Sequence, residues 1–112
     1  MATIDECVIA LKGVLGDLAA NPAAAGLERS LSCRFLDLGQ VALGRLGGGE
    51  VHDLRVVPDG KDVAKADIRF AMASDDLIAL TEGRLNFASA WASGRIKLHA
   101  GVRDVLRLRK LL

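Results

Sequence analysis

The chain has 112 residues, 51% of them hydrophobic and 26% charged, the composition of a globular protein long enough to fold as one domain, residues 1–112, without disulfides or a structural metal. Its 15 basic and 14 acidic side chains nearly cancel and its few aromatic residues are not interleaved with Lys and Arg, so no nucleic-acid partner is expected. The sequence has no run of 18 apolar residues and begins with an acidic segment, which predicts a cytoplasmic protein without a signal peptide or membrane span.

The first predicted element is a helix that begins after Thr3. Thr3 and Glu6 have the spacing of a capping box, in which each side chain accepts a hydrogen bond from the other residue's backbone. Apolar residues then recur every three or four positions and form one stripe, namely Ile4, Val8, Leu11, Leu15 and Leu18. Asn21 and Pro22 are expected to end this helix.

From residue 30 the hydrophobic period changes to two, which predicts strands. Three runs, 30–38, 40–46 and 50–57, are separated only by short glycine-containing links. Because such links are too short for a crossover helix, the three runs predict an antiparallel meander. A turn at 58–62 precedes a fourth predicted strand, 66–73, which places on one face Ile68, Phe70 and Met72.

The next segment predicts two short helices. Ser74 is expected to cap the first, whose opening turn holds acidic side chains and whose end is marked by Gly83. The inward-facing residues of this helix are expected to be Leu77, Ile78 and Leu80. Asn86 is expected to cap the second helix, and Gly94 to stop it.

The chain closes with a predicted strand and a predicted helix. Residues 95–99 alternate apolar and polar side chains, as a strand with one wet face does. The final helix, after Gly101, has an apolar side that consists of Val102, Val105 and Leu106, with Leu112 as a further candidate. The order of elements, from helix through four strands, two helices and a strand to a last helix, predicts an α+β domain with one twisted sheet covered on one face by helices.

No catalytic constellation is recognisable in the sequence. Cys7 and Cys33 lack the spacing of metal ligands and are expected to be free buried thiols, so no metal site is predicted. An isomerase or hydrolase that uses Asp37, His52 or His99 is the weakest of the hypotheses considered. The basic residues 107–110 suit the negative end of the last helix, and a weak docking face for anionic lipid headgroups is the alternative interpretation.

Apolar geometry gives the stronger indication of function. Phe87 and the only tryptophan, Trp91, are four residues apart, so on a helix they share one face and form a broad apolar wall. Such a wall is compatible with plain core packing, which stabilises a fold by about 1.5 to 3 kcal/mol per large side chain, and equally with the lining of a ligand site.

The last two-fifths of the chain resembles sterol carrier protein type 2 domains. The resemblance covers residues 66–112 and rests on the order and spacing of Ser74-Asp75-Asp76, Glu82 to Asn86, Phe87 to Trp91, Ser93 to Leu98, and Gly101. The N-terminal half agrees with that family only in its order of elements. The chain ends in "RKLL" and not in the peroxisomal tripeptide of eukaryotic members, so the resemblance points to a stand-alone bacterial member.

The resemblance implies a five-stranded, mainly antiparallel sheet with helices on one face and an apolar tunnel between them. Domains of this family carry fatty acids, fatty acyl-CoA, sterols or phospholipids noncovalently, or present them to attached enzymes, and they need no cofactor. Applied to this sequence, the resemblance predicts no enzymatic activity and a tunnel lined by nine residues: Ile68, Phe70, Met72, Leu77, Ile78, Phe87, Trp91, Val105 and Leu106.

A second hypothesis is a protein-interaction or dimerisation module that has a filled core and no ligand. A homodimer would then form through the free face of the sheet or through an edge strand. Leu36 and Leu38, at the end of the first predicted strand, are the residues that would favour such contact. A transient contact between the last helix and a membrane is a further partner hypothesis.

Overall fold

The computed structural model describes residues 2–60, 63 and 65–111, and all of their side chains except those of 23 and 108–111. The prediction for Leu112 therefore lies outside the described residues. In chain order the elements are α1 (Ile4–Ala20), the short 3₁₀ helix η1 (Pro22–Ala24), β1 (Arg29–Phe35), β2 (Gln40–Gly47), β3 (Glu50–Pro58), β4 (Ile68–Met72), α2 (Ser74–Thr81), α3 (Phe87–Ala92), β5 (Lys97–His99) and α4 (Val102–Leu111).

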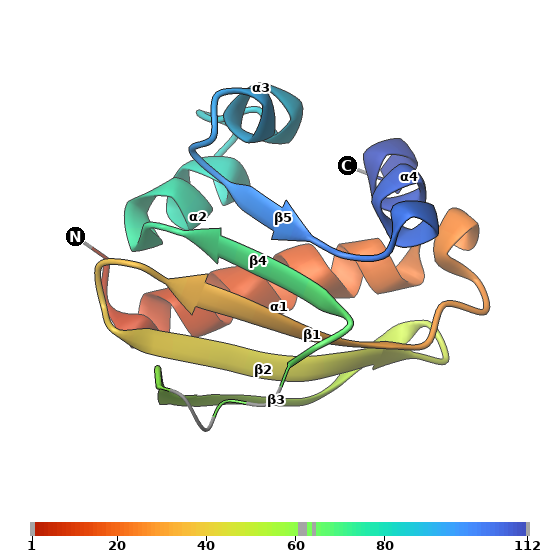
Figure 1. The fold of residues 1–112 in the computed structure, drawn as a ribbon, viewed down its shortest axis with the longest axis horizontal. Coiled ribbons are helices and arrows are strands. Elements are labelled where there is room, and N and C mark those ends of the chain that lie inside the picture. The colour runs from red at the N-terminus through yellow and green to blue at the C-terminus, as the bar shows by residue number, and fades with distance from the viewer. Residues whose placement is uncertain (1, 61–62, 64, 112) are drawn as a thin grey trace.

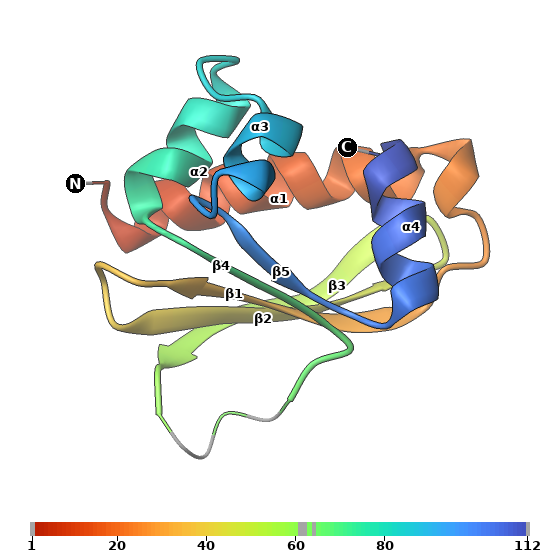
Figure 2. The same cartoon turned by 45° about the horizontal axis from the view of Figure 1, so that its top comes forward.

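The strands form one sheet in the order β3-β2-β1-β4-β5, and the helices gather on one face of it (Figures 1 and 2). Strands β1, β2 and β3 pair antiparallel, as the short links predicted, and β4 pairs antiparallel with β5. The predicted α+β architecture, with a five-stranded and mostly antiparallel sheet, is thus confirmed.

One pair of strands is parallel. Strand β4 lies beside β1, with Leu31 opposite Ile68 and Phe35 opposite Met72. The two strands in the middle of the fold are therefore joined by a long connection that contains the whole β2–β3 hairpin. This pairing places α2, which follows β4 directly, above the same sheet face as α1.

Strand β1 ends earlier than the alternation predicted. The backbone N–H groups of Leu38 and Gly39 both donate to the carbonyl of Phe35, at 3.1 and 3.2 Å, and Gly39 has a φ of +62°. Leu36 and Leu38 consequently lie in a turn and not on the strand. Leu36 is exposed, whereas Leu38 packs against the core, so the prediction that both extend the first strand is wrong.

The predicted start and end of α1 are confirmed. The Glu6 N–H donates to Thr3 Oγ1 at 3.2 Å, and the Thr3 N–H donates to Glu6 Oε1 at 3.1 Å, which completes the capping box. These bonds to Thr3 lower the pKa of Glu6. Asn21 caps the other end. The side of α1 that packs on the sheet consists of Cys7, Leu11, Leu15, Leu18 and Ala19.

Helix α2 begins differently from the prediction that Ser74 caps it. Its N-cap position is Ala73, and Ser74 is the first helical residue, buried and held by another part of the chain. The Ser74 N–H and hydroxyl donate to the two oxygens of the Asp37 carboxylate, at 2.8 and 2.5 Å. Partial burial acts to raise the pKa of Asp37, but these hydrogen bonds outweigh it and hold the pKa below its usual range. The β1–β2 turn thus supplies the cap.

The sheet contains one irregularity, in the β2–β3 pairing. The register shifts between Leu43 and Arg45, and Asp53 on the facing strand has a φ of +55°. A bulge of this kind increases the local twist and bends the strand. Strand β3 lies at one edge of the sheet, so the bulge bends that edge.

Helix α4 is attached to the rest of the fold through polar contacts. Arg29 Nε donates to Asp104 Oδ2 at 3.0 Å, and Arg107 donates to the carbonyl of Ala25 at 2.9 Å. Of the predicted apolar side of this helix, Val105 is half-buried, but Val102 and Leu106 are 78% and 55% exposed. That side therefore faces solvent in large part.

Candidate functional site

An apolar pocket of about 280 Å³ lies between the sheet and the helices α1 and α2. Its walls come from five parts of the fold: α1, the middle of β1, the strand β4, the helix α2 and residues 85–87, which lead into α3 and begin it. The lining residues are Leu11, Val14, Leu15, Leu18, Cys33, Phe70, Met72, Leu77, Leu80, Leu85, Asn86 and Phe87. Carbon dominates this surface, so an apolar ligand would lose contact with water there without leaving a buried charge unpaired.

The structure brings four of the nine predicted tunnel residues to this pocket: Phe70, Met72, Leu77 and Phe87. The other five lie elsewhere. Ile68 is buried in the core at the far end of β4, and Ile78 and Trp91 are half-buried against that core. Val105 and Leu106 belong to α4, which does not line the pocket.

The wall that sequence reasoning missed comes from α1. Leu11, Val14, Leu15 and Leu18 contribute a third of the lining, although the resemblance covers only residues 66–112. The signal was present in the apolar stripe of the first helix, which must face the same sheet as the predicted tunnel residues. A stripe alone does not distinguish helix-to-sheet packing from a surface that leaves space beside it.

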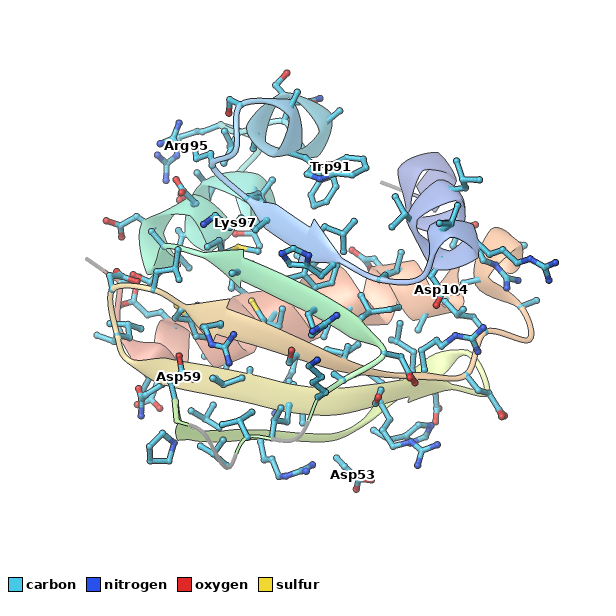
Figure 3. All side chains as sticks on the ribbon, in the orientation of Figure 1. Asp53, Asp59, Trp91, Arg95, Lys97 and Asp104 are labelled. Carbon is cyan, nitrogen blue, oxygen red and sulfur yellow. The ribbon has the colours of Figure 1, made fainter. Side chains whose placement is uncertain are left out.

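Three aromatic rings cluster on the side of the pocket nearest α3, and two of them, Phe70 and Phe87, line it. The ring centroids of Phe70 and Phe87 are 6.3 Å apart at an interplanar angle of 78°, and those of Phe87 and Trp91 are also 6.3 Å apart, at 39°. The predicted wall of Phe87 and Trp91 therefore exists. Phe87 lines the pocket, and Trp91 packs beside Phe87 without lining the pocket itself. In the view of Figure 3, Trp91 lies between α3 and α4.

Local sequence signals position α3. Asn86 caps the helix by accepting a hydrogen bond from the Ser89 N–H at 3.1 Å, and Gly94, with a φ of +78°, ends it; both features were predicted. Arg95 then donates to the buried carboxylate of Asp76 on α2 at 2.9 Å. This ion pair ties the end of α3 to α2, so the two helices hold Phe87 against the pocket together.

The thiol of Cys33, in the pocket wall, is expected to be unreactive. Cys33 is fully buried, and burial raises the pKa of its thiol to about 12. Burial likewise raises the pKa of Cys7, on α1, to about 11. A thiol nucleophile acts as the thiolate, so Cys33 serves this site as a small apolar surface. Both cysteines are free, as predicted.

A groove of about 550 Å³ adjoins the pocket between α1 and α2. The side chains of Val14, Leu18 and Leu80 border both this groove and the pocket, so the two spaces are neighbours. The remaining lining combines small and apolar residues with polar groups: Ile9, Ala10, Gly13, Asp17, Asn21 and Thr81. We call this space the α1–α2 groove.

The titratable residues of the weak enzyme hypothesis lie on three separate elements. Asp37 is in the turn after β1 and is engaged by Ser74, His52 is on β3 with Nε2 2.9 Å from the carbonyl oxygen of Gly47, and His99 is at the end of β5. Within the described residues, no three His, Cys, Asp or Glu side chains gather where they could hold a metal ion. No helix in the described part of the chain is long and apolar enough to cross a membrane.

Comparison with known proteins places this geometry in context. No family model matches the chain. A curated relative, mouse hydroxysteroid dehydrogenase-like protein 2, is 31% identical over 114 residues, which cover 97% of this chain. The chain spans about a fifth of that relative's length, 21%.

Solved structures of sterol carrier protein 2 domains are similar along nearly the whole chain. A crystal structure of sterol carrier protein 2 superposes with a TM-score of 0.66 at 22% identity, covering 95% of this chain and 90% of that one. The palmitated sterol carrier protein 2-like protein 2 from Aedes aegypti gives 0.62 at 16% identity, covering 95% and 91%. This chain has the sterol carrier protein 2 fold, and the resemblance predicted from residues 66–112 is confirmed at the level of the fold.

Proposed function

We propose that residues 1–112 act as a single lipid-binding domain that holds an apolar ligand noncovalently and transfers it between sites. The pocket between α1, α2 and the sheet is the observation on which the proposal rests, because its lining is almost entirely apolar. Fatty acids, fatty acyl-CoA, sterols and phospholipids are the ligand classes considered. The sterol carrier protein 2 fold supports this proposal, as does the similar protein from Aedes aegypti, which is palmitated.

The energetics of such binding need no charged contact. Each CH₂ group that leaves water contributes about 0.8 kcal/mol, so a chain of several methylenes binds through burial alone. The pocket is at the small end of ligand sites, which run from roughly 300 to 1,000 Å³. The adjoining α1–α2 groove lengthens the available path, which suits an elongated ligand better than a compact one.

Binding is tested by native mass spectrometry of freshly purified protein, followed by titration with palmitic acid, palmitoyl-CoA and cholesterol. Trp91 is the reporter, since its ring lies beside that of Phe87, with the centroids 6.3 Å apart, and Phe87 lines the pocket. We expect a co-purifying lipid or a saturable change in Trp91 fluorescence. Absence of both for every ligand would contradict the proposal and favour the interaction module without a ligand.

A matched pair of variants ties binding to the pocket. Leu80→Phe adds volume where the pocket and the groove meet, so we expect weaker binding. Leu36→Phe makes the same change at a turn residue that is 57% exposed and lines neither space, so binding should be unchanged. Circular dichroism and a urea denaturation curve for each variant establish that both fold.

Contact of α4 with a membrane during transfer is part of this proposal. The exposed side chains of Val102 and Leu106, together with Arg103 on the same helix, support it, because an interfacial helix combines apolar anchors with basic groups. Sedimentation with vesicles that contain phosphatidylglycerol measures the contact. Val102→Ser with Leu106→Ser should reduce the bound fraction, and equal binding by the wild-type protein and this variant would dispose of the idea.

A further inference from the structure

The α1–α2 groove has an electrostatic character of its own. It lies beside the last turns of both α1 and α2, since its lining includes Asp17, Leu18 and Asn21 from the end of one helix and Leu80 and Thr81 from the end of the other. The C-terminal end of a helix carries partial negative charge on its free carbonyls. Neither last turn contains a basic residue to offset that charge.

The side chains of the groove add to this negative character. Among the described residues that line it, the one charged group is the carboxylate of Asp17. The hydroxyl of Thr81 donates its proton to the carbonyl of Ile78 at 2.8 Å, so toward the groove its oxygen can only accept. Asp17 and Thr81 thus present hydrogen-bond acceptors and negative potential to the groove, while the side-chain amide of Asn21 can both donate and accept.

The cation that follows α2 does not reverse this balance. Arg84 does not line the groove, and its guanidinium donates to Glu82 Oε1 at 2.6 Å. That ion pair places a carboxylate beside the arginine, so the two charges largely cancel at a distance.

We propose that the α1–α2 groove is the mouth of the pocket and selects ligands whose polar end donates hydrogen bonds and carries no negative charge. A ligand chain would pass the shared residues Val14, Leu18 and Leu80 into the pocket and leave its head beside Asp17 and Thr81. The ligand class is a long-chain alcohol or ammonium, in preference to a carboxylate or a phosphate-bearing ester. This inference rests on the proposed lipid-binding function and specifies the head group for it.

The test compares three probes with one chain length: dodecylammonium, dodecan-1-ol and dodecanoate, each titrated below its micelle concentration at pH 7 and low ionic strength. Because only the head group varies, differences in affinity report on the groove. We expect dodecylammonium to bind most tightly and dodecanoate most weakly, with at least about fivefold between them, the size of effect that a helix end and a nearby carboxylate produce.

Two charge-matched variants assign the effect to its source. Asp17→Asn should narrow the difference between dodecylammonium and dodecanoate severalfold and leave the affinity for dodecan-1-ol unchanged. Asp53→Asn removes the same charge from the edge strand β3, outside the groove, and Asn tolerates the positive φ of that position; it should leave all three affinities unchanged.

The outcomes separate the two proposals. Dodecanoate binding as tightly as dodecylammonium, or a ratio that Asp17→Asn does not alter, would overturn the head-group preference while lipid binding stands. Failure of all three probes to bind would overturn the head-group preference, and if palmitic acid, palmitoyl-CoA and cholesterol also fail to bind, lipid binding is overturned with it.

Discussion

Two phenylalanines on the same face of the sheet have different surroundings. Phe35, at the end of β1, is fully buried. Phe87, at the start of α3, is half-buried, borders the pocket and is held by the rings of Phe70 and Trp91. The comparison shows that β1 to β3, which we call the base, surround Phe35 closely, whereas the segment from β4 to β5, which we call the wall, is apolar and borders the open space of the pocket.

The largest effect on stability is expected from removing the buried ring of Phe35. Phe35→Ala should lower the free energy of unfolding by about 3 to 5 kcal/mol, because the closely packed surroundings cannot collapse into the cavity. Phe87→Ala should cost less, under about 2 kcal/mol, because its ring already borders open space. Urea denaturation measures both. Equal costs would show that the two regions are packed alike.

The order of the two effects should be reversed for ligand affinity, where the change at Phe87 should have the larger effect. Phe87→Ala removes a wall of the pocket and should weaken the affinity for dodecan-1-ol, whereas a Phe35 variant that keeps the fold, such as Phe35→Leu, should bind normally. The fluorescence titration described above checks this, with native mass spectrometry for confirmation.

The contact between base and wall is expected to have the next largest effect. Asp37 in the β1–β2 turn caps α2 through Ser74, so Asp37→Ala should cost about 1 kcal/mol. Asp59→Ala, which removes an exposed ion pair with Arg34, should cost less. Urea denaturation curves of the two variants compare them.

This contribution depends on pH in a defined direction. Because the folded-state pKa of Asp37 lies below the ordinary value of 3.8, its contribution is fully present above that value and is lost as pH falls through the folded pKa. The stability difference between wild type and Asp37→Ala should therefore be constant from pH 7 to 5 and shrink below pH 3.8. A difference that persists at low pH would mean that the carboxylate is not the cap.

A pair of effects of similar or smaller size concerns two glycines. Gly83 ends α2 with a φ of +74°, so Gly83→Ala should destabilise the wall by about 1 kcal/mol. Gly16 is inside α1, and an added Cβ there would meet no atom within 4 Å, so Gly16→Ala should stabilise the base by about 0.5 to 1 kcal/mol. Thermal denaturation of both variants checks these opposite signs.

The last prediction is that neither cysteine of the folded protein reacts with a thiol reagent. With thiol pKa values raised to about 12 for Cys33 and about 11 for Cys7, neither should react with a thiol reagent at pH 8 in the folded protein. Both should react in urea. Rapid labelling of Cys33 without denaturant would mean that the pocket opens far enough to expose its floor.

The sequence predicted the elements far better than the spaces between them. Hydrophobic period and capping residues located α1, the meander and α3, because these signals act within a few residues. The parallel pairing of β4 with β1 was not predicted, since nothing near Ile68 specifies its distant partner Leu31. The prediction that Ser74 caps α2 was wrong for the same reason. The sequence around Ser74 is typical of a local cap, but the residue that caps the helix through Ser74 is Asp37, 37 positions earlier in the chain.

The candidate site was predicted in part for a related reason. Resemblance identified the segment that carries Phe70, Met72, Leu77 and Phe87, but not the α1 residues that complete the lining. Apolar stripes specify which side of a helix is covered, and not whether the covering is complete. The exposure of Val102 and Leu106 illustrates the same limit, because an apolar pattern alone does not state what lies opposite.

The bend in β3 has a consequence for how copies of this chain meet. An edge strand offers unpaired backbone groups to any neighbouring chain, and a long, flat edge invites stacking into fibres. Three features of β3 oppose such pairing: the twist at Asp53, the charged side chain of Arg55 and the proline that ends the strand. The bend in β3 therefore lowers the chance that copies of this chain pair edge to edge through that strand.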